Sequence, residues 1–446
     1  SLVVNSDDQL YILGTTLSNT FPTINAFDST HNGRTDILLA HFTEDCSQLL
    51  QSTYFGGSSD DGLNDGALIY NYADDFRGDI LTDSFKNIYV ATCSRSRNIP
   101  TTDSASYLNS QGNLDAVIFS FDKDLSKLRF STYYGGGDND AAYSVKLNSL
   151  GELYVGGGTI SGNFPTTLGA YNETRLGGSA DGFVLRLDTV FGRVEKSTIY
   201  GSSSYEQVHF IDIDLRDRVY VAGQTEGSLT RTSGTYGKDN TSQFIAALDK
   251  DLSKLEFQTN FGNRTNNPEL SPTAFLVDNC FNIYFSGWGS DIGAGHRGTT
   301  SGLETKDANW PNTDGNDFYL IVFNKEAKGL IYASFIGGTN SEDHVDGGTS
   351  RFDKNGIVYQ SVCASCPPPG TSQLSDFPTT SGSVFPSNPS IRCSNASFKL
   401  DFQITYVTEA KFILPQQICR NSIVKPINTG QGTTFKWDFG DGTIYN

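Results

Sequence analysis

Short stretches of alternating apolar and polar residues recur along this chain, and each has the length of a β-strand. One unit shows four of them in succession: Val145–Asn148, Glu152–Gly156, Asp181–Asp188 and Ser197–Gly201. A period of two, with β-branched and aromatic side chains, is typical of strands. Runs with the period of an α-helix are missing throughout. The pattern therefore predicts an all-β chain.

This four-strand unit occurs six times. Each copy carries a tyrosine at the same place in its second strand: Tyr11, Tyr89, Tyr154, Tyr220, Tyr284 and Tyr359. By subtraction, successive tyrosines are 78, 65, 66, 64 and 75 residues apart. A sheet of four short strands cannot bury both of its faces alone, whereas sheets stacked around an axis cover one another. We therefore predict a β-propeller of six four-stranded blades over residues 1–402, with a seventh blade if a further unit lies upstream.

The two ends of the repeat region complement each other. Residues 2–5 read as a first strand with no fourth-strand sequence ahead of them, and the last unit has a third strand, Ala396–Phe402, but no recognisable fourth. We expect a strand upstream of Ser1 to complete the last blade, because ring closure removes exposed sheet edges. The chain therefore reads as a fragment. Residues 403–446 end in Trp437–Thr443, where an alternating strand and a Gly-Asp-Gly turn predict the start of a small β-sandwich.

Charge narrows the classes of partner. Fifty acidic and 32 basic side chains give a net charge of −18. This balance argues against nucleic acid and anionic membrane surfaces, because phosphate groups are bound by basic stripes. No apolar run reaches the length that crosses a bilayer. The excess of acid is compatible with Ca²⁺ sites or with solubility alone.

Aspartates recur at two places in the unit. One group opens the third strands and comprises Asp36, Asp115, Asp181 and Asp317. A residue repeated in several blades is expected to be an architectural hydrogen-bonding group, since a reaction needs one centre. The other group follows the fourth strands and comprises Asp60, Asp61, Asp138, Asp140 and Asp343. Clustered carboxylates among glycines can ligate Ca²⁺ or can cap turns, and no other cofactor is indicated.

Three of the seven cysteines lie around the loop between the second and third strands of the last unit: Cys363, Cys366 and Cys393. In an exported protein we expect Cys393 to pair with Cys363 or Cys366. A Zn²⁺ site of three cysteines is the alternative, although the sequence shows no clear fourth ligand.

An enlarged loop in the fifth unit is the candidate for recognition. Trp288 and Trp310 flank this Gly-, Thr- and Asn-rich insertion. Aromatic side chains beside polar ones suit sugar stacking or protein docking. Because Trp288 follows directly from a strand, it can equally fill space between blades.

Several short elements carry a family resemblance. Phe164–Thr167 reads Phe-Pro-Thr-Thr, Asp181–Val184 reads Asp-Gly-Phe-Val, and Ser131–Gly136 reads Ser-Thr-Tyr-Tyr-Gly-Gly. These elements resemble the SBBP repeat, a β-propeller repeat, and the similarity covers residues 1–402. Trp437–Thr443 resembles the PKD signature. The fourth unit departs from the pattern, since it lacks the Phe-Pro element.

The resemblance implies a place in the cell and a class of function. Residues 277–289, 343–353, 362–366 and 393–402 together look like large secreted surface proteins of Bacteroidota. In these proteins such a propeller precedes PKD modules and a C-terminal type IX secretion signal, often labelled gliding-motility-associated. The resemblance thus implies a secreted or outer-membrane-associated propeller that acts as a scaffold, adhesion or partner-binding module. Its partner would be a cell-surface or secretion-system protein, or a glycan.

We expect this module not to be an enzyme. The five histidines are unpaired, and no serine or cysteine nucleophile motif appears. One alternative is a propeller lyase or glycosidase that acts on polysaccharide, with two carboxylates or a His–Tyr pair at the central pore. The other alternative is a purely structural spacer between neighbouring modules.

Overall fold

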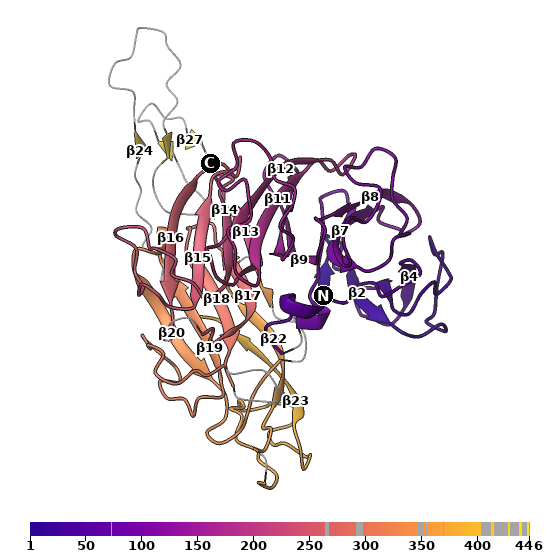
Figure 1. The fold of residues 1–446 in the computed structure, drawn as a ribbon. Helices are drawn as coiled ribbons and strands as arrows, with labels where there is room; N and C mark the ends of the chain where they lie inside the picture. Colours follow the sequence, from indigo (N-terminus) through magenta and orange to yellow (C-terminus); the bar gives the residue numbers. More distant parts are fainter. Residues whose placement is uncertain are drawn as a thin grey trace.

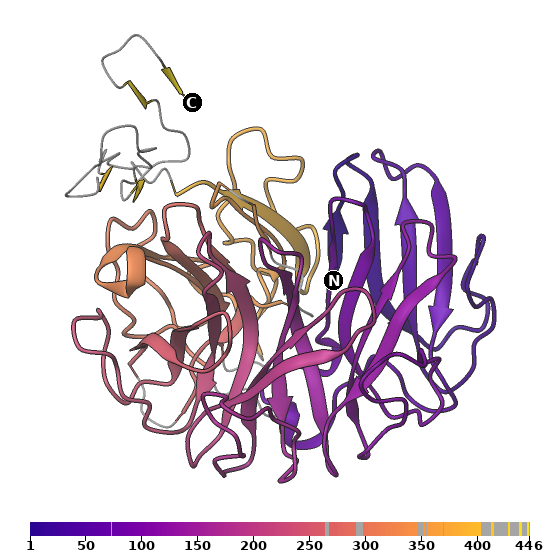
Figure 2. The same ribbon diagram turned by 90° about the horizontal axis from the view of Figure 1, so that it is seen from above.

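Six antiparallel sheets follow one another along the chain. The computed structural model describes residues 1–402, apart from residues 73, 264–266, 291–297, 346–350, 354 and 369, and four short strands beyond residue 402. In Figure 1 the sheets are arranged around a common centre, and Figure 2 shows the gold sixth sheet between the orange fifth and the indigo first. This arrangement is the predicted β-propeller.

Each blade is a meander in which consecutive strands are neighbours. Blade one contains β1 (Leu2–Val4), β2 (Leu10–Thr16), β3 (Asp36–Phe42) and β4 (Leu49–Phe55). Blade two contains β5 (Asp79–Thr82), β6 (Ile88–Ser94), β7 (Asp115–Phe121) and β8 (Leu128–Tyr134). Blade three contains β9 (Asp140–Leu147), β10 (Leu153–Thr159), β11 (Asp181–Leu187) and β12 (Val194–Tyr200).

The remaining blades repeat this order until the last. Blade four contains β13 (Glu206–Ile213), β14 (Val219–Thr225), β15 (Gln243–Leu248) and β16 (Leu255–Phe261). Blade five contains β17 (Ser271–Val277), β18 (Ile283–Trp288), β19 (Phe318–Phe323) and β20 (Leu330–Ile336), with a 3₁₀ helix, η3 (Lys325–Ala327), between the last two. Blade six contains β21 (Arg351–Phe352), β22 (Val358–Ala364) and β23 (Ser394–Leu400). Its sheet has three strands, in the order β21-β22-β23.

The hydrophobic core lies between the blades. Five clusters of buried side chains each join two successive blades, from the cluster between blades one and two to the cluster between blades five and six. The second-strand tyrosines take part, because the rings of Tyr11, Tyr89, Tyr154, Tyr220 and Tyr284 are at most 2% exposed. The hydroxyl of Tyr11 donates to the carbonyl of Lys123 in the next blade (2.8 Å). Each sheet therefore covers the apolar face of its neighbour, as the repeat predicts.

The contact between blades six and one is polar. The guanidinium of Arg351 on β21 donates to Asp79 Oδ1 (2.7 Å) and to the hydroxyl of Ser1. The Ser1 ammonium donates to the carbonyl of Leu13 (2.9 Å). Arg351 of the last blade thus meets Ser1 of the first blade and Asp79 of the second in a small charged cluster near the centre of the ring.

A segment between blades one and two fills the central channel. It contains two 3₁₀ helices, η1 (Gly66–Leu68) and η2 (Asp74–Phe76), which appear as the purple coil at the centre of Figure 1. The side chains of Asn71 and Gln224 on β14 exchange two hydrogen bonds of 2.8 and 2.9 Å. Gln207 on β13 donates to the carbonyl of Leu68 (3.1 Å). We call residues 62–78 the plug, and its insertion accounts for the longest tyrosine spacing.

Beyond residue 402, two short strand pairs are described. β24 (Phe412–Ile413) pairs with β25 (Ile427–Asn428), and β26 (Trp437–Asp438) pairs with β27 (Ile444–Tyr445). The rest of the predicted PKD-like module, residues 403–446, lies outside the described residues. Among the helices that the structure describes, none is long and apolar enough to span a membrane.

Candidate functional site

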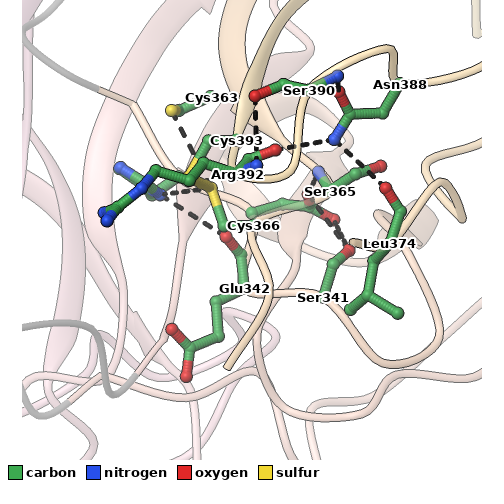
Figure 3. The surroundings of a disulfide bond; sticks show 12 residues. Ser341, Glu342, Cys363, Ser365, Cys366, Leu374, Asn388, Ser390, Arg392 and Cys393 are labelled. Carbon is green, nitrogen blue, oxygen red and sulfur yellow. Dashed lines mark hydrogen bonds between the residues drawn. A yellow bond between two sulfur atoms is a disulfide. The ribbon is translucent and has the colours of Figure 1, made fainter. Parts of the chain in front are cut away.

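The loop that joins β22 to β23 is the most elaborate surface feature of the sixth blade. We call residues 365–393 the sixth-blade loop. A disulfide between Cys366 and Cys393 closes its base, which is one of the two pairings that the sequence leaves open (Figure 3). The Asn388 side chain donates to the carbonyls of Leu374 (3.1 Å) and Arg392 (2.7 Å) inside the loop. These contacts give the loop a defined structure.

An apolar groove lies between this loop and the start of β23. Its volume is about 240 Å³, and its lining includes Phe377, Phe385, Pro386, Pro389 and Ala396 with serine, threonine and asparagine side chains. Three large apolar side chains of the loop face solvent: Val384 is 87% exposed, Phe385 74% and Ile391 77%. Apolar side chains gathered on one surface mark sites of interaction.

The sheet beside this groove ends in an unpaired edge. β23 pairs with β22 along its whole length, from Ala364 opposite Ser394 to Val358 opposite Leu400. In the part of the chain that the structure describes, no strand pairs with the other edge of β23. Among the described residues, the backbone N–H and C=O groups on the outer edge of β23 therefore face outward.

The loops that follow the fourth strands bring carboxylates together in pairs. At the junction of blades two and three, a Cβ atom built on Gly135 would lie 2.5 Å from Asp115 Oδ1 and 2.5 Å from Asp140 Oδ2, so these two oxygens are at most 5.0 Å apart. Corresponding pairs at other junctions are Asp36 with Asp61, Asp181 with Glu206, and Asp317 with Asp343. The fourth blade has Gln243 at the third-strand position. In the sequence these two groups of aspartates occupy separate places in the unit, whereas the fold brings one member of each group together at a blade junction.

In the pair between blades two and three, each carboxylate has one anchored side. Asp140 Oδ2 accepts hydrogen bonds from Gly136 N (2.7 Å) and Ser161 Oγ (2.8 Å). Asp115 Oδ2 accepts hydrogen bonds from the Ser110 hydroxyl (2.6 Å) and two backbone N–H groups. The other oxygens, Asp115 Oδ1 and Asp140 Oδ1, are buried without a hydrogen-bond partner among the described residues.

Burial of these pairs disfavours their charged forms. Burial, with the nearby charge of Asp115, raises the pKa of Asp140 to about 6. Burial also raises the pKa of Asp61 and of Asp343 to about 6, and the pKa of Asp181 and of Asp317 to about 7. Two facing carboxylates with free oxygens are stabilised by a shared proton or by a bound cation.

The Ca²⁺ ligands expected from the sequence divide into two sets. Asp61, Asp140 and Asp343 are buried at the blade junctions, whereas Asp60 lies nearer the surface beside Arg34 and Asp138 is exposed. The pair of Asp115 and Asp140 offers two carboxylate oxygens without a hydrogen-bond partner among the described residues, and Ca²⁺ takes six to eight oxygen ligands. The described oxygens are therefore enough to share a proton, whereas Ca²⁺ needs further oxygen ligands.

The channel holds side chains capable of acid–base chemistry, but the plug covers them. The rings of Tyr143 and His209 stack at 5.8 Å and are 4% and 1% exposed. Burial, together with the positive charge of the Arg77 guanidinium, lowers the pKa of His209 to about 3. Burial also raises the pKa of Tyr143. A neutral histidine beside a protonated tyrosine is thus sealed inside the ring.

The two tryptophans do not form an exposed platform. Trp288 is 1% exposed, and its ring contacts Tyr72 of the plug and His344. Trp310 is half-buried against the same core cluster, and its backbone N–H donates to Ser334 Oγ (3.0 Å). This placement corrects the expectation for Trp288, because a side chain at the end of a central strand fills the space between blades.

A second pocket lies between blades four and five. Its volume is about 260 Å³, and Tyr236, Lys238, Glu304 and Tyr319 contribute to its lining. The Tyr236 hydroxyl donates to the Glu304 carboxylate, and the Lys238 ammonium donates to Asn263 Oδ1 (3.0 Å). Aromatic rings thus lie beside charged groups in this pocket, and no sequence motif pointed to it.

Comparisons with known proteins concern the fold alone. No family model and no curated protein matches the chain. Among solved structures, a protein of unknown function from Dyadobacter fermentans is 11% identical, with a TM-score of 0.43, and the match covers 82% of this chain and 90% of that chain. A PL25 ulvan lyase, a polysaccharide lyase, is 9% identical, with a TM-score of 0.38 and coverage of 80% and 74%. The SBBP and PKD resemblances stay predictions.

Many of the structures found are propeller enzymes. An intramolecular trans-sialidase from Ruminococcus gnavus is 7% identical, with a TM-score of 0.38 and coverage of 82% of this chain and 89% of that chain. A β-xylosidase is 12% identical, with a TM-score of 0.34. This finding contradicts the expectation that the chain is not an enzyme, so that expectation is not retained. At such identities none of these activities is assigned to this chain.

Proposed function

We propose that this propeller is a secreted module that binds an extended segment of a protein partner on its sixth blade. The observation that carries the proposal is the unpaired edge of β23 beside an exposed apolar groove. An extended segment can add to such an edge through backbone hydrogen bonds, while neighbouring pockets take alternate side chains. The Cys366–Cys393 disulfide supports the secreted location, since such bonds persist in oxidising compartments.

The complete blades show what an added strand would contact. In blade three, Thr167 of the Phe-Pro-Thr-Thr element exchanges hydrogen bonds with Ser197 of the fourth strand: Thr167 N donates to Ser197 O (3.1 Å) and Ser197 N donates to Thr167 Oγ1 (3.0 Å). Blade two repeats this exchange between Thr102 and Ser131 at 3.2 Å. The second threonine of the element thus fixes the register of the fourth strand.

Blade six contains the same element, and no fourth strand is paired beside it in the described part of the chain. Thr380 ends its Phe-Pro-Thr-Thr element, and the turn is conformationally equivalent, since Ser383 N donates to Thr380 O at 3.1 Å as Ala170 N does to Thr167 O. Thr380 is exposed. We infer that the segment bound here resembles the fourth strands of this chain, with a serine opposite Thr380.

A peptide that copies residues 128–136 tests the proposal, because it contains a complete Ser-Thr-Tyr strand. We expect saturable binding in fluorescence anisotropy. Thr380→Val should weaken binding because the valine cannot accept the peptide N–H, whereas Thr379→Val on the neighbouring exposed residue should not. Phe385→Ser should weaken binding by removing part of the groove.

Two results would overturn the proposal. One is a peptide affinity that is the same in T380V and T379V. The other is the loss of peptide binding when a chain extended at its N-terminus supplies the fourth strand itself, because the blade would then be completed by its own polypeptide and would not serve a partner.

A second candidate is glycan binding in the pocket between blades four and five. The observation that favours it is the pairing of Tyr236 and Tyr319 with Lys238 and Glu304 in one pocket, since sugars stack on aromatic rings and hydrogen-bond to charged groups. Tyr236→Ala should then abolish retention on a polysaccharide affinity gel. Unchanged retention would remove this candidate.

A further inference from the structure

Four side chains able to bind a metal converge at the base of the sixth-blade loop. Cys363 and Cys366 lie at the end of β22 and just after it, and Cys393 directly precedes β23. His344 joins them through the backbone, because its N–H donates to Cys363 O (3.1 Å) and Cys363 N donates to its carbonyl (2.9 Å). Two strands and a bridge thus hold the cluster together.

The distances within the cluster fit a tetrahedral metal site. Cys366 Sγ is 3.8 Å from Cys363 Sγ and 3.7 Å from His344 Nδ1, and the ligand atoms of these three residues lie within 4.8 Å of one another. Cys393 Sγ is bonded to Cys366 Sγ. Zn²⁺ with Zn–S of about 2.3 Å and Zn–N of about 2.0 Å gives tetrahedral edges of about 3.8 Å between sulfurs and about 3.5 Å between sulfur and nitrogen.

The surroundings suit a closed site. Cys366 is 4% exposed and His344 is 6% exposed, while Cys363 and Cys393 are half-buried. In Figure 3 the sulfur atoms of the three cysteines face one another, and the Glu342 carboxylate points away from them. The Cys-x-x-Cys spacing of Cys363 and Cys366 is common among zinc sites. The sequence shows three sulfur ligands, and the fold supplies the imidazole as the fourth.

We propose that Cys363, Cys366, Cys393 and His344 bind one Zn²⁺ as a Cys₃His site when the disulfide is reduced, and that the Cys366–Cys393 bond is the metal-free form of the same site. Reduction by a phosphine supplies two electrons to the S–S bond and gives two thiols, while the phosphine takes an oxygen atom from water. Zn²⁺ then displaces one proton from each of three thiols, and His344 binds as neutral imidazole through Nδ1.

Such a site is structural. Four protein ligands leave no open position for water or substrate, which is the arrangement of structural zinc. The metal ties the base of the sixth-blade loop to β22 and to the segment that carries His344. The disulfide links only the two ends of the loop, so the zinc form restrains more of the blade.

Co²⁺ is the probe for this proposal, because its visible spectrum reports both coordination number and thiolate ligands. The whole chain is reduced with a phosphine without oxygen, titrated with Co²⁺ and then with Zn²⁺. We expect one Co²⁺ per chain with tetrahedral d–d bands and thiolate charge-transfer bands, which Zn²⁺ removes stoichiometrically. Native mass spectrometry should show one Zn²⁺ in the reduced chain and none in the oxidised chain.

Three variants separate this site from other thiols. Cys363→Ser and His344→Gln each remove one ligand and leave the disulfide able to form. Each should weaken Co²⁺ binding by more than about tenfold, since even outer-shell partners of metal ligands are worth 10–100-fold. Cys46→Ser removes an exposed thiol in blade one and should bind as the unaltered chain does.

Thermal unfolding of the oxidised variants checks that each still folds. Metal binding that C363S and H344Q leave unchanged would overturn the proposal. So would a phosphine-treated chain that binds no Co²⁺, whether its cysteines are all thiols or peptide mapping shows that a Cys363–Cys366 disulfide has formed.

Discussion

Asp140→Asn should make the propeller more stable above pH 7 and should leave its stability unchanged near pH 4. Asp140 is buried at the junction of blades two and three, and both hydrogen bonds that it accepts go to one oxygen, Oδ2. The amide oxygen of asparagine can accept both. The amide nitrogen then replaces Oδ1, which has no partner among the described residues. The substitution therefore removes a buried charge and keeps the anchor.

The magnitude follows from the raised pKa of Asp140. The pKa of Asp140 is about 6 in the folded chain, against 3.8 for the ordinary group. Between pH 3.8 and pH 6, the folded chain therefore holds a proton on this carboxyl that the unfolded chain has lost. Stability linked to this proton is present below pH 3.8 and is lost as the pH rises through 6. At 1.36 kcal/mol per pH unit the loss is about 3 kcal/mol. With an unfolding entropy of about 2.1 cal/mol/K per residue over some 400 residues, this is about 3–4 °C.

Thermal unfolding at pH 4, 6 and 8 measures the effect. We expect the difference in melting temperature between D140N and the unaltered chain to be near zero at pH 4 and about 3–4 °C in favour of D140N at pH 8. Asp138→Asn, in the same loop but exposed, is the matched control and should give no pH-dependent difference. Lower stability of D140N at pH 8 would refute a shared proton. If Ca²⁺ stabilises the unaltered chain but not D140N, a cation occupies the pair instead.

Two further predictions concern the glycine between the carboxylates and the plug. Gly135→Ala should destabilise the ring by about 1–3 kcal/mol, because its Cβ would lie 2.5 Å from two carboxylate oxygens, whereas Gly162→Ala meets nothing within 4 Å and should be neutral in chemical denaturation. Asn71→Ala should cost about 1–3 kcal/mol, because it leaves the buried Gln224 amide without two hydrogen bonds; an unchanged denaturation midpoint would show that the plug does not stabilise the channel.

The internal repeat made most of the fold predictable from the sequence. The alternation of apolar and polar residues predicted the strands, and the six tyrosines showed where each blade repeats. Once one four-strand unit was recognised, the other five could be assigned by comparison with it. The plug was not predictable, since residues 62–78 have no counterpart in other units and their partners, such as Gln207 and Gln224, lie more than 100 residues away.

The candidate site was predictable only in part. The three cysteines of the last unit were recognised from their spacing, but His344 joins them through an isolated bridge to Cys363 that no local pattern encodes. For Trp288 the local sequence was misleading. An aromatic side chain beside a polar insertion was expected to be exposed, but the strand that carries it places it in the core. The pairing of aspartates across Gly135 likewise depends on how neighbouring blades meet.

Amide hydrogen exchange on β23 tests most directly whether the sixth blade is a binding edge. The chain is compared alone and with the peptide that copies residues 128–136. We expect exchange of the amides in residues 394–400 to slow when the peptide is present, and the slowing to disappear in T380V. Unchanged exchange in 394–400 at a peptide concentration that saturates the anisotropy signal would contradict strand addition at this blade.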